Sequence, residues 1–180
     1  MAFFALVSTI ERERVLEHVL ANPLKKINMN AMARTLKLSP GQIHKCIAMM
    51  RKEGLVHGDR LIENPITAAL RLIFNLRKVE KAKIIETLRR RIPGCQGIGL
   101  FGSWSKGTNT ESSDVDLWVK MQNEPSDAQI AAVRKVLQAK MGTAMDLVVA
   151  TPLRMAELSE KSPSTFHSLH HGILLWGDAL

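Results

Sequence analysis

The stretch GLFGSWSKGTNTESSDVDLWVK, residues 99–120, contains the pattern that decides the fold of the second half of the chain. An apolar run ends at Gly102-Ser103, and ten residues rich in Ser, Thr, Asn and Gly follow it. A second apolar run then begins with Asp114-Val115-Asp116-Leu117. Two apolar runs joined by small polar residues predict two buried strands with a tight loop or a short helix between them.

Two carboxylates stand one residue apart at the start of the second strand. Because side chains alternate along a strand, Asp114 and Asp116 are expected on one face with Trp118, and the apolar residues between them on the core face. Like charges on one face repel each other, and a divalent cation would remove that cost. Oxygen ligands alone indicate Mg²⁺ or Mn²⁺ rather than Zn²⁺.

A third acidic residue, Asp146, interrupts the apolar run 144–149 at a position that leaves its apolar neighbours facing inward. Residues 126–141, between the two strands, have the apolar spacing of a helix. Asp146 is therefore a candidate third carboxylate beside the cation expected at Asp114 and Asp116, where it could bind and activate a nucleophile.

The segment between the first two strands has the composition of a phosphate-binding loop. Its glycines permit a tight loop whose backbone N–H groups are exposed to phosphate oxygens. Ser103 adds a hydroxyl at the end of the first strand, and Lys106 adds a cation. We expect the phosphates of a nucleotide to contact five residues of this segment: Gly102, Ser103, Lys106, Gly107 and Ser113.

Gly102-Ser103, ten residues and Asp114-x-Asp116 form a GS-x10-D-x-D signature, so that residues 94–150 resemble the DNA polymerase β-like nucleotidyltransferases. More closely, GSWSKGTNTESSDVDL resembles the minimal nucleotidyltransferases of bacteria and archaea, some of which are antitoxins paired with HEPN-type ribonuclease toxins. The resemblance implies an α+β domain with a mixed sheet and flanking helices. It also implies a nucleoside triphosphate substrate, with ATP expected, and a HEPN-like toxin as partner.

The same resemblance implies that Gly102 and Ser103 bind the triphosphate. It also implies that Asp114, Asp116 and Asp146 form a catalytic carboxylate triad that binds two Mg²⁺ ions. Three positions depart from the family pattern, which often has Arg where this chain has Trp104 and Lys106, and an acid where it has Thr108. Lys106 still offers a phosphate a positive charge, as a point charge rather than a planar fork. Trp104 offers a phosphate no positive charge, and we expect its ring to stack on a base.

The first half of the chain predicts a separate small domain. Helices are expected over about 9–21, 28–36 and 40–53, where apolar residues recur at helical spacing. Ser8-x-x-Glu11 has the pattern of a capping box at the start of the first helix. Ser39-Pro40 is an N-cap followed by proline at the start of the third helix. Residues 55–57 and 60–62 then predict a two-strand ribbon with a two-residue turn.

Three helices and a ribbon resemble a winged helix-turn-helix DNA-binding domain. The predicted organisation is therefore this domain over residues 1–64 and a nucleotidyltransferase domain over 65–180, in which 65–92 form connecting helices. We expect one connecting helix around Leu70–Leu76 and another over Val79–Arg91. Winged helix proteins commonly dimerise on two half-sites, which predicts a homodimer.

The third predicted helix and the ribbon carry the residues expected to bind double-stranded DNA: Gln42, His44, Lys45, Arg51, Lys52 and Arg60. Gln42 and Lys45 lie near the helix start, where side chains reach base edges in the major groove. Lys52 and Arg60 are expected to contact phosphates. The alternative is a winged helix that serves protein contact alone.

The net charge of +8 is unevenly distributed. Residues 1–94 contain 18 Lys and Arg against 8 Asp and Glu, whereas residues 95–180 contain 7 against 9. The basic charge of the first half favours a polyanion partner for that half. The alternative is a solvated basic surface that only keeps the protein soluble.

No apolar run approaches the ~20 residues that a membrane span needs. The N-terminal run 1–7 lacks a basic start and a cleavage site, so we expect it to pack in the core of a cytoplasmic protein without a membrane partner. Cys46 and Cys95 lie too far apart in the sequence to form a metal-ligand pair, and together with the missing signal peptide they indicate reduced thiols.

The function predicted from these features is Mg²⁺-dependent transfer of a nucleoside monophosphate, AMP above all, from a triphosphate to an acceptor hydroxyl. The acceptor is expected on a protein, an RNA or a small molecule, and a partner toxin is one such protein. The alternative is a DNA-binding transcriptional regulator whose nucleotidyltransferase domain only senses nucleotide. The presence of Asp146 argues against that alternative, because a protein that only binds nucleotide has less need of a third carboxylate.

Overall fold

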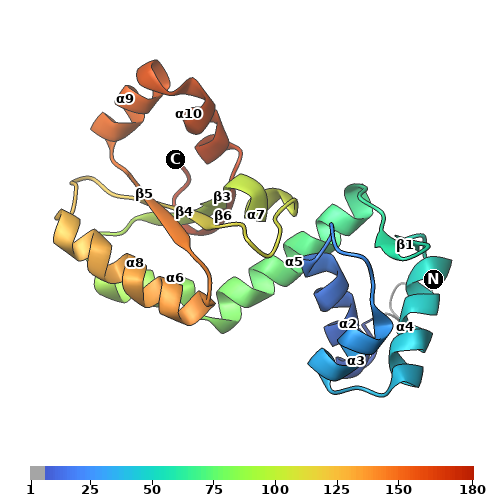
Figure 1. The fold of residues 1–180 in the computed structure, drawn as a ribbon. Coiled ribbons are helices and arrows are strands. Elements are labelled where there is room, and N and C mark those ends of the chain that lie inside the picture. The colour runs from blue at the N-terminus through green and yellow to red at the C-terminus, as the bar shows by residue number, and fades with distance from the viewer. Residues whose placement is uncertain (1–6) are drawn as a thin grey trace. The chain divides into compact units, whose positions relative to one another are not determined.

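The structure is a computed structural model, and it describes residues 7–180 (Figure 1). The chain forms two compact units, with the division between Arg71 and Leu72. Val7 is 38% exposed, and the rest of the N-terminal run expected to pack in the core, residues 1–6, lies outside the described residues. In the described part of the chain, no helix is long and apolar enough to cross a membrane.

In the described part of the first unit, three helices and a two-stranded ribbon precede α5 (Pro65–Lys81), as the sequence predicts. The elements are α2 (Ile10–Ala21), α3 (Met29–Leu36), α4 (Pro40–Lys52), β1 (Val56–His57) and β2 (Arg60–Leu61). The start of α2 differs from the predicted capping box. Thr9, in an extended conformation, is the N-cap and accepts a hydrogen bond from the backbone N–H of Arg12, whereas Ser8 binds the Arg12 side chain.

The helix start at Ser39 is a complete capping box. The Ser39 side chain accepts from the backbone N–H of Gln42, and the Gln42 side chain accepts from the backbone N–H of Ser39. The predicted inward face of α4 is buried, with Ile43, Ile47 and Met50 each fully enclosed. Assignment of this unit to the winged helix-turn-helix type stays a prediction.

The connecting segment differs from the prediction in its helix boundaries. A single helix, α5 (Pro65–Lys81), covers the region where a break near residue 77 was expected, because the sequence has no Gly or Pro between Pro65 and Lys81. The break comes instead at Lys83, whose φ of 52° is left-handed, and α6 (Ile84–Arg91) follows.

The second unit is built on a mixed four-stranded sheet of order β5-β4-β3-β6. Its strands are β3 (Gly97–Phe101), β4 (Val115–Lys120), β5 (Met145–Ala150) and β6 (Ile173–Gly177). Its further helices are α7 (Gly102–Lys106), α8 (Asp127–Met141), α9 (Pro152–Lys161) and α10 (Pro163–His170). β4 and β5 are parallel, and β3 is antiparallel to both β4 and β6. The predicted α+β class and mixed sheet are therefore confirmed.

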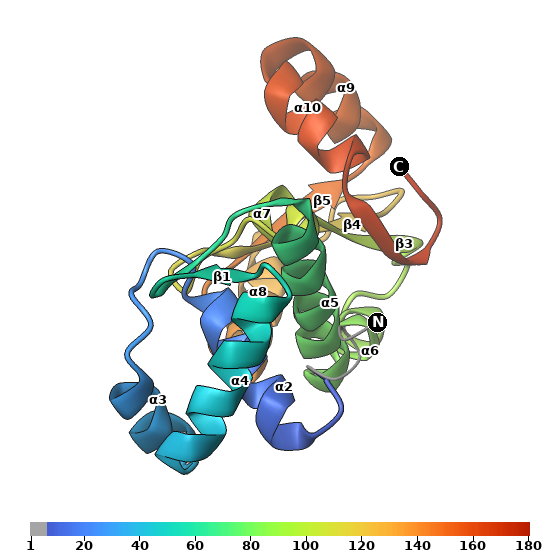
Figure 2. The ribbon, with the colours of Figure 1, turned by 90° about the vertical axis from the view of Figure 1, so that its right-hand side faces the viewer.

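Helices cover both faces of this sheet, as Figures 1 and 2 show. On one face, α6 and α8 pack against the buried side chains of the central strands, which include Leu100, Val115 and Leu117. On the other face, Leu169 of α10 packs on Phe101 and Trp118. Asp116 and Trp118 share that second face, so the predicted alternation of β4 is confirmed, and Trp118 lies in a small apolar core rather than at the surface.

Candidate active site

Two of the predicted carboxylates are register partners. Asp116 of β4 pairs with Asp146 of the parallel strand β5, and on its other side it pairs with Phe101, the last residue of β3. Partners in neighbouring strands place their side chains on the same face. Asp114 lies before the first residue of β4 and is exposed. The sheet thus brings Asp116 and Asp146 together, with Asp114 two residues before the first of them.

Gly102 begins α7 directly against the Asp116 carboxylate. Its φ is +67°, and a Cβ added there would overlap Oδ2 of Asp116. A left-handed φ already disfavours any side chain, and the carboxylate leaves no space for one. The glycine of the Gly102-Ser103 pair is therefore required for Asp116 to lie at the end of β3.

The pKa of Asp116 is raised above its ordinary value. Burial is the main cause, since a half-buried carboxylate loses hydration, and the charges of Asp146 and then Asp114 add to the effect. Both neighbours disfavour the ionised form of Asp116, which is the repulsion that the sequence pattern predicts. A cation beside this group would stabilise its charged form.

The polar segment after Gly102 forms a short helix and an ordered loop. Ser103 is half-buried and Lys106 exposed on α7, and Gly107 ends the helix at a φ of 64° by donating to the carbonyl of Ser103. Later in the loop, the Ser113 hydroxyl accepts from the backbone N–H of Thr110 at 2.9 Å. The hydroxyl of Ser113 therefore supports the loop, and its predicted contact with nucleotide stays a prediction.

Trp104 does not fulfil the expectation that it stacks on a base. Its side chain is only 6% exposed and belongs to the main apolar core of the second unit. Its indole N–H lies 3.4 Å from the carbonyl of Ser113. The tryptophan that replaces the family's arginine thus stabilises the loop, because its large apolar ring is buried in the core next to the loop.

A buried pair of amides, which the sequence reading missed, holds the same loop. Asn75 on α5 donates to Oδ1 of Asn109 at 2.7 Å and to the carbonyl of Trp104 at 2.9 Å. Both asparagines are nearly fully buried, at 3% and 6% exposure. The position of Asn75 directly after the apolar Phe74 could have indicated a polar residue near the core. Nothing in the sequence indicates that Asn109 is its hydrogen-bond partner.

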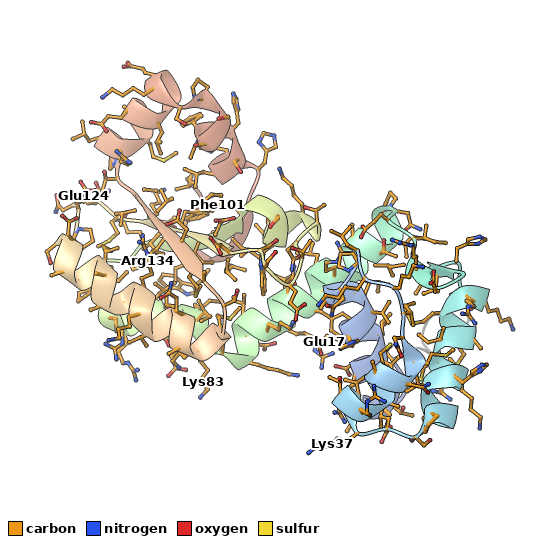
Figure 3. All side chains as sticks on the ribbon, viewed as in Figure 1. Glu17, Lys37, Lys83, Phe101, Glu124 and Arg134 are labelled. Atoms are coloured by element: carbon orange, nitrogen blue, oxygen red, sulfur yellow. The ribbon has the colours of Figure 1, made fainter. Side chains whose placement is uncertain are left out.

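Asp146 has an ion-pair partner that the sequence also did not indicate. Nη2 of Arg134, on α8, lies 3.3 Å from Oδ1 of Asp146, and both side chains are partly exposed. Figure 3 labels Arg134 on α8. Over residues 7–180, no group of three or more acidic, His or Cys side chains is arranged to hold one metal ion. The donor set at Asp114 and Asp116 is all oxygen, which suits Mg²⁺, and the metal assignment stays a prediction.

The predicted DNA-binding residues lie on α4 and the ribbon, and all of them are exposed: Gln42, His44, Lys45, Arg51, Lys52 and Arg60. Two of them have contacts within the chain. Gln42 completes the capping box, and the Arg51 guanidinium donates twice to the carbonyl of Gly58 in the ribbon turn, at 2.7 and 3.1 Å. DNA binding by the six residues stays a prediction.

A family of nucleotidyltransferase domains matches residues 81–166. The protein adenylyltransferase MntA of Thermococcus cleftensis is 37% identical to this chain over 67 residues, which are 37% of this chain and 67% of the relative. The chain belongs to the nucleotidyltransferase family. MntA of Shewanella oneidensis is also 37% identical, over 71 residues that make up 39% of this chain and 48% of that protein.

Solved structures give similar matches. A toxin–antitoxin complex with AMP-PNP contains a chain 27% identical, with a TM-score of 0.43, over 58% of this chain and 74% of that one. A tri-AMPylated Shewanella oneidensis HEPN toxin in complex with an MNT antitoxin gives 26% identity and a TM-score of 0.41, over 59% and 73% of the two chains. The nucleotidyltransferase match lies wholly in the second unit, and the chain is an enzyme of this family.

Proposed function

We propose that the second unit transfers AMP from ATP to a hydroxyl group of a protein, with Asp146 as general base. The observation that carries the proposal is the register of β4 and β5, which sets Asp146 beside Asp116, at the point where Gly102 starts the loop. The relatives from Thermococcus and Shewanella are named protein adenylyltransferases, which favours ATP as donor and a protein as acceptor.

In the proposed reaction, Asp146 accepts the proton of the acceptor hydroxyl. The freed oxygen attacks the α-phosphorus in line and forms a new O–P bond, while the bond to the bridging oxygen of the β-phosphate breaks. Pyrophosphate leaves with that electron pair, and the positive charge of exposed Lys106 and the Ser103 hydroxyl stabilise it.

Asp114 and Asp116 are the residues proposed to hold Mg²⁺, with Asp146 as a third ligand and Mn²⁺ as a substitute ion. The raised pKa of Asp116 supports this assignment, because a nearby cation would offset the repulsion between these carboxylates. When bound, the two ions would neutralise the triphosphate and stabilise the attacking and leaving oxygens.

A HEPN-type toxin is the partner we propose, since the minimal nucleotidyltransferases that the motif resembles include antitoxins of such toxins.

The exposed cations Lys45, Lys52 and Arg60 support double-stranded DNA as a second partner, bound by the first unit as a homodimer. The competing function is that of a DNA-binding transcriptional regulator whose second unit only senses nucleotide.

Covalent labelling tests the proposed function. Full-length protein, Mg²⁺ and ATP labelled in the α-phosphate should label a protein of the native host lysate, whereas ATP labelled in the γ-phosphate should not. Asp146→Asn should reduce labelling about 10²–10⁴-fold, the usual contribution of a general base, and should still bind nucleotide. Asp178→Asn, a change at an exposed residue of the same unit, is the control. If wild type binds nucleotide but labels no protein, the sensor function is correct.

A further inference from the structure

Arg134 approaches Asp146 from the opposite layer of the second unit. Val133, its neighbour on α8, is buried against the sheet face that carries Met145 and Leu147 of β5. Because side chains alternate along β5, Asp146 lies on the other face. β5 is the edge strand of the sheet, so the Arg134 side chain passes its open edge to place Nη2 3.3 Å from Oδ1 of Asp146.

Two donors meet on the same oxygen of Asp146. Oδ1 accepts from Arg134, and it also accepts from the backbone N–H of Leu147 at 2.9 Å. Donors on one oxygen limit the rotation of a carboxylate about its last bond and direct its second oxygen away from them. Oδ2 is therefore the atom of Asp146 available to the acceptor hydroxyl or to a metal ion.

One nitrogen of the Arg134 guanidinium is enclosed, although the side chain as a whole is 41% exposed. Its Nε is buried and has no hydrogen-bond partner within residues 7–180, although Nη2 reaches Asp146. A buried donor without a partner costs stability, so this nitrogen itself does not stabilise the fold. Lys135, the next residue of α8, is exposed and provides a natural comparison.

We propose that Arg134 is a positioning residue for the general base: it orients the Asp146 carboxylate so that Oδ2 faces the reacting hydroxyl. The proposal rests on the proposed function. Partners that orient reactive or metal-binding carboxylates typically change activity about 10–100-fold when removed. ATP binding is assigned to other residues, Ser103 and Lys106, so the effect should fall on kcat rather than on KM for ATP.

Kinetics of α-phosphate transfer by full-length protein tests the proposal. Arg134→Gln should lower kcat about 10–100-fold with KM for ATP within about twofold of wild type. Arg134→Lys should recover part of the loss, since it restores a donor and a charge. Lys135→Gln removes the same charge one residue away and should match wild type. Equal kcat for Arg134→Gln and wild type would overturn the proposal, and a higher kcat would show that Arg134 competes with the reaction instead.

Crystal structures of wild type and Arg134→Gln with AMP-PNP and Mg²⁺ give a readout that does not need turnover. In wild type, Oδ1 of Asp146 should contact Arg134 and the Leu147 N–H, and in the variant the carboxylate should be rotated or disordered. An unchanged carboxylate in the variant would refute the proposal. If wild type transfers no label, the proposed function fails, and the two structures still decide whether Arg134 orients Asp146.

Discussion

The side-chain amide of Asn75, on α5, donates to Oδ1 of Asn109 at 2.7 Å inside the second unit, where both residues are buried. The same amide also donates to the carbonyl of Trp104. One helix thereby fixes two points of the segment that connects Gly102 to Asp114, and it does so through polar atoms that have no access to water.

Asn75→Ala is expected to destabilise the protein strongly. The change leaves the Asn109 amide and the Trp104 carbonyl buried without this donor, at about 1–3 kcal/mol for each unsatisfied group. Thermal unfolding followed by circular dichroism should show a lower Tm, by about 2–4 °C per kcal/mol. In a double-mutant cycle with Asn109→Ala, the combined loss should be smaller than the sum of the single losses. Additive losses would indicate that the two amides stabilise the loop independently.

Gly102→Ala should abolish transfer through its effect on Asp116. The new methyl group overlaps Oδ2 of Asp116 and requires a side chain at a φ of +67°. Gly142→Ala is a matched control, because Gly142 has a φ of +70° and open space where its Cβ would be. Both variants should lose about 1 kcal/mol of stability from the left-handed backbone, whereas Gly102→Ala alone should lose α-phosphate transfer. Equal activity of the two variants would disprove a role for the Gly102–Asp116 contact.

Asp116→Asn should stabilise the protein at neutral pH in the absence of metal and nucleotide. The folded-state pKa of Asp116 is raised by burial and by Asp146 and Asp114, so its ionised form disfavours the folded state. That cost is fully present above the raised pKa. It disappears as the pH falls through that pKa toward the ordinary value of 3.8, where the residue is protonated in both states.

The measurement is the difference in Tm between Asp116→Asn and wild type at a series of pH values from 7 to 4, in EDTA. The difference should be positive at pH 7 and should shrink as the pH is lowered. Asp178→Asn, at an exposed position, should show no such trend. A difference that grows on acidification has the wrong sign and would mean that Asp116 is stabilised as an anion.

Mg²⁺ with ATP should raise the Tm of wild type, because a ligand that binds only the folded state stabilises it. Asp116→Asn should remove most of the rise, since it deletes one proposed ligand and relieves the repulsion that the cation would offset. Asp178→Asn should keep the full rise. Differential scanning fluorimetry over a Mg²⁺ titration measures both, and an unchanged wild-type Tm would argue against a metal site at these carboxylates.

DNA binding by the first unit should depend steeply on salt. In the full-length protein, Lys45→Ala and Arg60→Ala should each weaken binding to duplex DNA. Arg60→Ala, which removes an expected phosphate contact, should also reduce the salt slope by about 1. Lys161→Ala, on α9 of the second unit, is the control for the removal of one exposed charge. If fluorescence anisotropy detects no duplex binding at low salt, the first unit serves protein contact instead.

The sequence predicts those parts of the structure that depend on local pattern. The alternation around Asp116 predicted the correct strand faces, and the cap at Ser39 predicted the correct helix start, because each depends on residues close together in the chain. The first cap was placed one residue early. The Glu that follows at the third position favours Ser8, but Thr9 has the extended backbone of an N-cap and its side chain accepts from the Arg12 N–H.

Features that join distant segments were not predictable in this way. Nothing local in α8 shows that Arg134 meets Asp146, because the contact depends on which strand forms the edge of the sheet. The burial of Trp104 depends likewise on the core formed by α6, α8 and the strands, so the expectation of an exposed stacking ring was wrong. The same holds for Asn75 and Asn109, 34 residues apart.

The crossover helix α8 connects β4 to the parallel strand β5 and also carries Arg134. Each residue inserted or deleted in an α-helix turns what precedes it by about 100° and shifts it by about 1.5 Å. An insertion between Arg134 and Met141 would therefore rotate the guanidinium off the strand edge, even where a loop could absorb the added length. Natural variants of this chain should accordingly vary in the loop before Asp127 and keep the number of residues from Arg134 to Asp146 constant.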